Sequence, residues 1–449
     1  MSSKLYENGS SQAVALADLI AAQVQVIVTA YSASGQTIPS LDSTTAGPFD
    51  EPANTPANIS MAIQLIEAAC AQLCATVASP GHSITKKTYN YVEPACMLVV
   101  VNAKIADLLL GKPEGEHVEV LAKQAELDTG KLGRVLRLLA TNHCFIEVKP
   151  NVFANNRLSL KLVSSDPTSA MVGLLTDEGL KSSAYVNETL FDPKSGPSML
   201  PEDAAFKRAH GSPIFELHKR PEEKYRADRF AEAMIGWATV TDGNDLSKVY
   251  PWDELPPGTT ICDVGGNTGH ATLPLIKAHP KLQIVLQDLP AVIEQAKEFW
   301  RRENPKAIDN QNIHFVPVDF FKDSLTHGCD YYYIRHVLHN WAEVECIMLL
   351  TNVRKAMTSS STLLIHDMVL QPLVRNTTSV FDQAPEPLLP NYGVGRVLLY
   401  QQDINMMGFV NSKERTLEEF IDLGSQAGFD FVKIWDAGEA NSLLEFRAL

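Results

Sequence analysis

Basic residues, disulfide patterns and long apolar runs are scarce in this chain of 449 residues, and each scarcity excludes a class of protein. Lys and Arg number 38 against 53 Asp and Glu, which gives a net charge of −15. This charge repels phosphate backbones and argues against nucleic acid as a general partner. The apolar stretch at 13–31 is interrupted by Asp18, Gln23 and Gln25. It therefore lacks the run of about 20 apolar residues that a membrane span needs.

The N-terminus and the cysteines point to the cytoplasm. Met1–Ser10 has no basic segment ahead of an apolar core, so no signal peptide is expected. The number of cysteines is 7, which is odd, and none forms a CxxC or Cys/His cluster with zinc spacing. They indicate reduced, mostly buried thiols in a cytosolic protein. A disulfide between Cys70 and Cys74 is the weaker alternative.

Residues 1–200 are predicted to form a mainly helical region. Ser, Thr, Gly and proline are concentrated at 32–58, which is typical of a linker. The segment 116–160 reads as two helices and then two short β-like runs around a Pro-Asn turn, which indicates a winged-helix module. Its charged side chains nearly balance, so packing or dimerisation is favoured over DNA binding.

Residues 201–449 are predicted to form a second, α/β region. Apolar strands alternate with helices from residue 258, which favours a Rossmann-like, doubly wound parallel sheet. An antiparallel hairpin is expected at the C-terminus, from Phe429–Trp435 and Ser442–Arg447. The predicted parallel strands are Thr259–Val264, Gln283–Asp288, Ile313–Asp319, Asp330–Arg335 and Thr362–Met368.

A glycine-rich turn follows the first of these strands. A dinucleotide fingerprint that begins at Gly265 needs glycine at positions 267 and 270, where this chain has Asn267 and His270. A nucleotide-dependent oxidoreductase is therefore disfavoured but stays an alternative. The remaining pattern, Asp263-x-Gly265-x-x-x-Gly269, resembles the first motif of class I S-adenosylmethionine-dependent methyltransferases, and the resemblance makes Asp263, Gly265 and Gly266 cofactor-binding residues. That resemblance implies a loop around the amino-acid end of the cofactor.

Two further acids stand at the ends of the second and third strands. Asp288 can accept hydrogen bonds from both ribose hydroxyls, and a charged acceptor strengthens such bonds. By resemblance, Asp319 takes the adenine amino group and Phe320 packs near the ring. Each acid alone could equally be a helix cap or a solvated turn. Acids at three successive strand ends favour a cofactor site, because ligands bind at the carboxyl ends of such strands.

The fourth strand leads into Arg335-His336-Val-Leu-His339-Asn-Trp. This segment closely resembles the plant and fungal phenolic O-methyltransferases of the caffeic-acid and polyketide-tailoring type. The resemblance makes His339 the general base and places Arg335 near the cofactor. A phenol has a pKa of about 10 and an imidazole one of about 6.5, so a neutral imidazole can take the phenolic proton. His336 is the rival base.

Two acids are expected to flank the base. Asp367 ends the fifth strand, and Glu414 lies in a Lys-Glu-Arg-Thr run that resembles a motif of the same family. By that match they hold the imidazole in one tautomer and offset its charge. Capping is the alternative role for both. A metal site at His336 and His339 is disfavoured, because no carboxylate or third ligand lies at a fixed spacing.

The acceptor is the least defined part of the prediction. Candidate substrate-wall residues are Phe230, Met234, Trp237, Met406 and Met407, although side chains at such spacing are more often core. A proline-rich loop at 371–391 is expected beside the substrate mouth. The resemblance implies a metal-free methyl transfer to a phenolic hydroxyl in a homodimer. An N or C acceptor, and a non-catalytic winged-helix regulator, stay open as alternatives.

Overall fold

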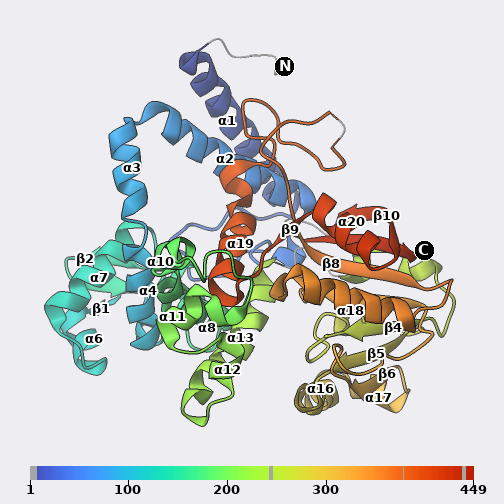
Figure 1. Cartoon of the computed structure of the whole chain (residues 1–449). Coiled ribbons are helices and arrows are strands. Elements are labelled where there is room, and N and C mark those ends of the chain that lie inside the picture. Colours follow the sequence, from blue (N-terminus) through green and yellow to red (C-terminus); the bar gives the residue numbers. More distant parts are fainter. Residues whose placement is uncertain (1–7, 242–245, 378, 437–440) are drawn as a thin grey trace. The chain divides into compact units, whose positions relative to one another are not determined.

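The computed structural model describes residues 8–241, 246–377, 379–436 and 441–449, which belong to two compact units (Figure 1). The N-terminal unit combines Met1–Thr241 with Pro372–Val397, and the C-terminal unit combines Asp242–Gln371 with Leu398–Leu449. The chain thus divides after Thr241, and not after residue 200 as the sequence predicts. The reason is helix α13 (Lys224–Thr241), which packs on α8 (Pro167–Leu174). A Cβ at Gly236 would lie 2.4 Å from the carbonyl oxygen of Pro167.

The N-terminal unit is mainly helical, as predicted. Its helices besides α8 and α13 are α1 (Gly9–Ala33), α2 (Ala57–Val77), α3 (Pro80–Thr88), α4 (Val92–Asn102), α5 (Ile105–Leu108), α6 (Val118–Gln124), α7 (Thr129–Thr141), α9 (Leu180–Ser183), α10 (Val186–Phe191), α11 (Ala205–His210) and α12 (Ile214–His218). Residues 34–56, within the predicted linker, hold only a 3-10 turn at Pro52–Asn54.

The proline-rich segment after the fifth strand is part of this unit. Leu388 and Tyr392 share a buried cluster with Leu16 of α1 and Leu65 of α2. The side-chain amide of Gln72 donates a 2.7 Å hydrogen bond to a carbonyl oxygen of this segment, that of Pro387. The segment therefore covers the α1–α2 pair, a role that the sequence analysis did not foresee.

Helices α1 and α2 are both long and apolar enough to cross a membrane by length and composition, among the residues described. This finding differs from the sequence expectation that residues 13–31 fall short of a span. In the structure the two helices pack against each other, and Leu16, Leu65 and Ala69 are buried between them. All seven cysteines are free thiols; Cys70 and Cys74 are exposed on α2 and form no disulfide.

The segment predicted as a winged-helix module has the expected order of elements. Strand β1 (Glu116–His117) is followed by α6 and by α7, whose first turn is capped by Asp128 through a 2.8 Å bond to the amide of Lys131. Strands β2 (Ile146–Lys149) and β3 (Val152–Ala154) complete a three-stranded antiparallel sheet in the order β1-β3-β2.

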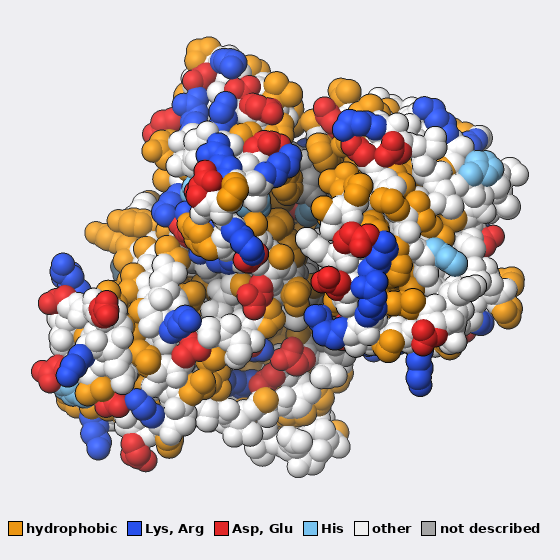
Figure 2. Space-filling model, turned by 90° about the horizontal axis from the view of Figure 1, so that it is seen from below, with side chains coloured by type: hydrophobic (Ala, Val, Ile, Leu, Met, Phe, Trp, Pro, Cys, Tyr) orange, Lys and Arg blue, Asp and Glu red, His pale blue; other side chains and the backbone are white. Residues whose placement is uncertain are grey.

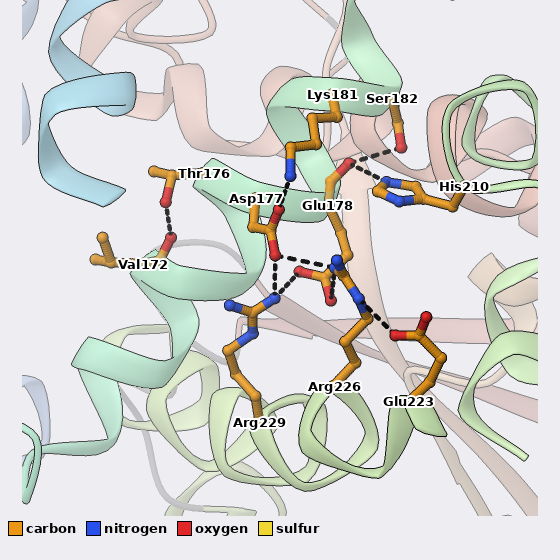
Figure 3. Close-up of polar contacts among 10 residues, drawn as sticks. All are labelled: Val172, Thr176, Asp177, Glu178, Lys181, Ser182, His210, Glu223, Arg226 and Arg229. Carbon is orange, nitrogen blue, oxygen red and sulfur yellow. Dashed lines mark hydrogen bonds and ion pairs between the residues drawn. The ribbon is translucent and has the colours of Figure 1, made fainter. Parts of the chain in front are cut away.

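A buried ion-pair network ties α13 to the π-helical turn Leu175–Gly179 that follows α8 (Figure 3). Asp177 contacts Arg226 at 2.9 Å and Arg229 at 2.7 Å, and it also pairs with Lys181. Glu178 is fully buried and contacts the same two arginines at 3.0 and 2.5 Å. Burial raises the pKa of Asp177, but Arg229 and Lys181 outweigh it and lower that pKa to about 2.

The C-terminal unit is built on one large sheet. Its main path has the order β10-β11-β8-β7-β4-β5-β6. Five strands are parallel: β4 (Thr260–Val264), β5 (Gln283–Asp288), β6 (Ile313–Pro317), β7 (Tyr331–Arg335) and β8 (Thr362–Leu370). The remaining elements are β9 (Arg415–Thr416), β10 (Phe429–Asp436), β11 (Asn441–Ala448), α14 (Leu246–Val249), α15 (Leu273–Ala278), α16 (Pro290–Glu303), α17 (Pro305–Asp309), α18 (Glu343–Ala356), α19 (Val397–Val410) and α20 (Leu417–Gln426).

The parallel core confirms the predicted strand–helix alternation. Crossover helices α16 and α18 lie on opposite sides of the sheet, as right-handed connections that run in opposite directions require (Figure 1). The C-terminal hairpin is confirmed by antiparallel pairing of β10 with β11, and β11 in turn pairs with β8. Residues 437–440 of the predicted turn lie outside the described residues. On the face that Figure 2 shows, acidic and basic side chains are interspersed among apolar ones.

Candidate active site

The glycine-rich turn lies at the carboxyl end of the central strand β4. Gly265 has a φ of 69°, and a Cβ there would lie 3.3 Å from the ring of Phe320. A Cβ at Gly266 would lie 2.4 Å from the carboxyl carbon of Asp263. Any larger residue at these two positions would displace the acid or the ring. Asn267, with a φ of 55°, takes a left-handed conformation that asparagine tolerates.

Asp263 is buried beneath this turn. One of its carboxylate oxygens accepts a 2.9 Å hydrogen bond from the hydroxyl of Thr272. Burial raises the pKa of Asp263 to about 7, against the opposing effects of Thr272 and the positive charge of Arg335. Arg335 is the last residue of β7, so its charge stands at the same end of the sheet as the turn. The charge of Arg335 and the carboxyl group of Asp263 thus interact at the end of the sheet that carries the glycine-rich turn.

Asp288, the last residue of β5, is bonded to the turn. Its two carboxylate oxygens accept hydrogen bonds from the amides of Asn267 at 2.8 Å and Leu289 at 2.7 Å. A carboxylate has about four acceptor positions, so this one keeps capacity for further donors. Burial raises the pKa of Asp288 above its ordinary value, although the hydrogen bonds from the two amides act in the opposite direction. The donor and acceptor pattern fits a ligand with adjacent hydroxyl groups.

Asp319 and Phe320 follow β6, which ends at Pro317 rather than at Asp319 as predicted. The last backbone bond to β5 runs from the amide of Val318 to the carbonyl oxygen of Asp288 at 2.9 Å, and the amide of Asp319 donates instead to the carboxylate of Asp323. Asp319 accepts hydrogen bonds from the amide of Phe321 at 3.1 Å and from Lys322 at 2.7 Å, and the bond from Lys322 lowers its pKa. Phe320 lies against Gly265. The strand ends thus bring all three predicted acids to one edge of the sheet.

His339 lies in the short turn Leu338–Asn340 that follows β7, and it is bonded to Glu414. The distance from its Nδ1 to a carboxylate oxygen of Glu414 is 2.9 Å. Glu414 is fully buried as a side chain. Burial opposes the charged imidazole, but Glu414 and then Asp367 outweigh it and raise the pKa of His339 to about 9. This pKa lies well above the ordinary imidazole value of about 6.5 on which the sequence prediction rests.

Asp367 contacts the other histidine of the segment. One of its carboxylate oxygens lies 3.3 Å from Nδ1 of His336, and its side chain is fully buried. It acts on His339 through its charge, whereas the sequence analysis expected it to hold that imidazole directly. The neighbouring His366 is bonded to the hydroxyl of Tyr333 at 2.7 Å, and burial lowers its pKa well below the usual value. His366 is therefore neutral.

Arg415 is a positioning residue that the sequence analysis did not single out. It is fully buried, and its guanidinium donates 2.9 Å hydrogen bonds to the carbonyl oxygens of Leu338 and Trp341, on either side of His339. Ser412 adds a 2.9 Å bond to the carbonyl oxygen of Trp341. Arg415 belongs to the Lys-Glu-Arg-Thr run, in which the sequence predicts a role for Glu414 alone. These bonds fix the backbone that carries the imidazole.

The candidate substrate-wall residues fall into two sets. Phe230, Met234 and Trp237 are half-buried on α13 of the N-terminal unit. Met406 is buried and Met407 half-buried on α19, in the C-terminal unit. Because the two sets belong to different compact units, their role as one substrate wall stays a prediction.

The sequence of this chain is similar to those of several known proteins. A family model described as an O-methyltransferase domain matches residues 198–430. The chain is 50% identical over 433 residues to a "3-O-methyltransferase 2" of Phanerochaete chrysosporium, with 96% of each chain covered. It is 30% identical over 471 residues to the "O-methyltransferase tpcA" of Aspergillus fumigatus, with 97% of this chain and 96% of the relative covered.

Solved structures agree on the fold. A structure of OxaC in complex with SAH and oxaline matches with a TM-score of 0.72 at 21% identity, over 98% of this chain and 100% of that chain. A structure of LepI in complex with SAM matches with a TM-score of 0.71 at 18% identity, over 96% of this chain and 100% of that chain. At these identities the likeness supports the fold alone.

Proposed function

The chain belongs to the O-methyltransferase family and depends on S-adenosylmethionine, and we propose that it methylates a phenolic hydroxyl of a small aromatic metabolite with His339 as the general base. The observation that carries this proposal is the 2.9 Å bond from His339 to the buried Glu414. It orients an imidazole at the carboxyl end of β7, the same end of the sheet as the glycine-rich turn.

The residues around the turn fit the cofactor that the family uses. In this proposal Gly265 and Gly266 let the backbone approach the cofactor. Asp288 accepts hydrogen bonds from its ribose hydroxyls. Asp319 accepts a hydrogen bond from the adenine amino group, and Phe320 packs near the adenine ring. Asp263 and Arg335 flank its amino-acid end. When bound, the cofactor supplies a methyl group on a positively charged sulfur.

The base reaction follows from the tautomer that Glu414 selects. With its Nδ1–H directed at Glu414, His339 keeps a lone pair on Nε2 to accept the phenolic proton. Nε2 of His339 would take the proton of the phenolic hydroxyl, and the bound cofactor would supply the methyl group that the phenolic oxygen receives. A histidine pKa of about 9 lies close to the phenol value of about 10, so the proton transfer is nearly balanced. Glu414 and Asp367 offset the positive charge that His339 acquires.

The remaining parts of the proposal concern assembly and acceptor. The N-terminal helices and the 116–160 module are proposed to organise a homodimer, and the protein is proposed to be cytoplasmic. Phe230, Met234, Trp237, Met406 and Met407 are proposed to line the acceptor pocket. A relative named as a 3-O-methyltransferase at 50% identity supports an oxygen acceptor.

The test of the base is a matched set of histidine variants. We expect His339→Gln to lower kcat by about 10²–10⁴-fold, the range of a general base, while S-adenosylhomocysteine raises the Tm as in wild type. The exposed His327→Gln variant, on the same unit, should keep full turnover. Wild-type-like turnover in His339→Gln would refute the assignment, and loss of turnover in His336→Gln instead would identify the rival base.

A further inference from the structure

Two histidines that follow β7 and a carboxylate of the neighbouring strand β8 converge; Asp367 lies within β8, which runs on to Leu370 and does not end beside Asp367 as predicted. Each of His336, His339 and Asp367 offers one ligand atom, and these atoms all lie within 4.8 Å of one another. The parallel register, which pairs Arg335 with His366, brings Asp367 beside the His336–His339 turn. The sequence spacing gave no third ligand for this histidine pair, because the missing ligand comes from the neighbouring strand.

Some polar atoms of His336 and Asp367 are buried without hydrogen bonds in the part of the chain that the structure describes. Among the described residues, Nε2 of His336 and one carboxylate oxygen of Asp367 are buried without a hydrogen-bond partner, while Nδ1 of His336 has the 3.3 Å ion-pair contact with Asp367. Buried polar atoms without a partner are costly, and a bound ion is one way to satisfy them. His336 also has a φ of 48°, in the left-handed region that a non-glycine residue rarely adopts. The fold thus holds His336 in place against a backbone cost.

The spacing and the surroundings suit a transition-metal ion. The 3.3 Å between Nδ1 of His336 and the carboxylate of Asp367 matches the separation of about 3.3 Å between ligands of a tetrahedral zinc ion with bonds of about 2.0–2.1 Å. Glu414 is hydrogen-bonded to Nδ1 of His339. Metal-binding histidines commonly bond through their second ring nitrogen to a carboxylate in this way. Two imidazoles and one carboxylate suit zinc and similar divalent ions better than magnesium or calcium.

We propose that His336, His339 and Asp367 form a binding site for a divalent transition-metal ion, and that the bound ion inhibits methyl transfer. The inhibition rests on the proposed function, because the ion would take the Nε2 lone pair with which His339 is to accept the substrate proton. The binding itself does not rest on it. In this proposal methyl transfer proceeds without a metal, and a bound metal ion would occupy the base.

Binding is tested on the full-length protein after removal of metal with EDTA. The probe is Zn²⁺ in calorimetry, with Co²⁺ absorbance as a second readout, in a Cys70→Ser/Cys74→Ser background because both thiols are exposed. We expect one equivalent to bind, with at least tenfold weaker binding in His336→Gln and Asp367→Asn. His327→Gln is the matched control and should bind as the background does. Equal affinity in the background, His336→Gln and Asp367→Asn would overturn the site. A Tm increase with S-adenosylhomocysteine shows that each variant is folded.

Turnover is then measured against the same Zn²⁺ series. We expect inhibition to follow occupancy, to reverse with EDTA, and to weaken at least tenfold in His336→Gln relative to that variant's own metal-free rate. Activation by Zn²⁺, or inhibition unrelated to occupancy, would overturn the inhibitory role. His339→Gln separates the two proposals. Normal zinc binding with lost turnover rejects the site and keeps the base, whereas lost zinc binding with normal turnover rejects the base and keeps the site.

Discussion

Two clusters of buried charge, one in each unit, differ in what balances their acids. In the N-terminal unit, Asp177 and Glu178 face Arg226 and Arg229, which stay charged at any ordinary pH (Figure 3). In the C-terminal unit, Glu414 contacts His339 at 2.9 Å and Asp367 contacts His336 at 3.3 Å. A guanidinium fixes the charge of its partner, whereas an imidazole can gain or lose a proton. The first arrangement holds helices together, and the second suits proton transfer.

The largest expected effect comes from breaking the arginine network. Arg229→Met leaves two buried acids with one arginine fewer, which costs about 3–5 kcal/mol when a buried pair is broken. Hydrogen exchange of the α8 and α13 amides should then rise by at least about a hundredfold at neutral pH. Because the arginines hold the pKa of Asp177 at about 2, below the ordinary value of about 3.9, this stabilisation is present above pH 4 and lost as pH falls through 2. An exchange rate unchanged by the substitution would contradict the structural role.

Asp288 is a half-buried acid of a third kind, bonded to backbone amides and to neither cation type among its described contacts. Asp288→Asn removes the charge of the proposed acceptor for the ribose hydroxyls, and hydrogen bonds to charged groups are worth about 1.5–3 kcal/mol. We therefore expect S-adenosylhomocysteine to bind about 10- to 100-fold more weakly by calorimetry. The exposed Asp309→Asn variant is the control. Equal affinity in the two variants would remove Asp288 from the cofactor site.

The smallest effect is expected at an exposed ion pair on the same helix as the arginines. Lys224 contacts Asp228 at 2.5 Å on α13, and both side chains are well exposed. Such pairs contribute about 0–1 kcal/mol. Lys224→Met should thus leave the exchange of the α13 amides within about fivefold of wild type. A loss as large as that of Arg229→Met would show that burial is not what distinguishes the network.

Local patterns in the sequence predicted the C-terminal unit well. The strand Gln283–Asp288 has the bounds of β5, and the strand ends place Asp263, Asp288 and Asp319 at one edge because parallel connections require it. His339 and Glu414 are brought together as the motif match implied, although 75 residues separate them. The alternation of apolar strands with helices is a local sequence pattern, and it predicts that these strand ends share one edge of the sheet.

Contacts that depend on packing between distant segments were not predictable. The proline-rich segment at 372–397 joins the N-terminal unit through Leu388 and Tyr392, which no local pattern announces. The pairing of Asp367 with His336 depends on the β7–β8 register and on the turn after β7. Arg415 belongs to the Lys-Glu-Arg-Thr run, but the backbone carbonyls to which it donates carry no side-chain signature in the sequence.

The central claim is that Glu414 sets the protonation of the base His339. The direct test is the pH profile of kcat/KM for wild type and Glu414→Gln with one phenolic acceptor. The wild-type rate should rise by roughly tenfold per pH unit below an inflection near 9, since the neutral imidazole is the base. In Glu414→Gln the pKa of His339 should fall toward its ordinary value of about 6.5, with at least about a tenfold lower maximum. An inflection at the same pH in both proteins would contradict the account.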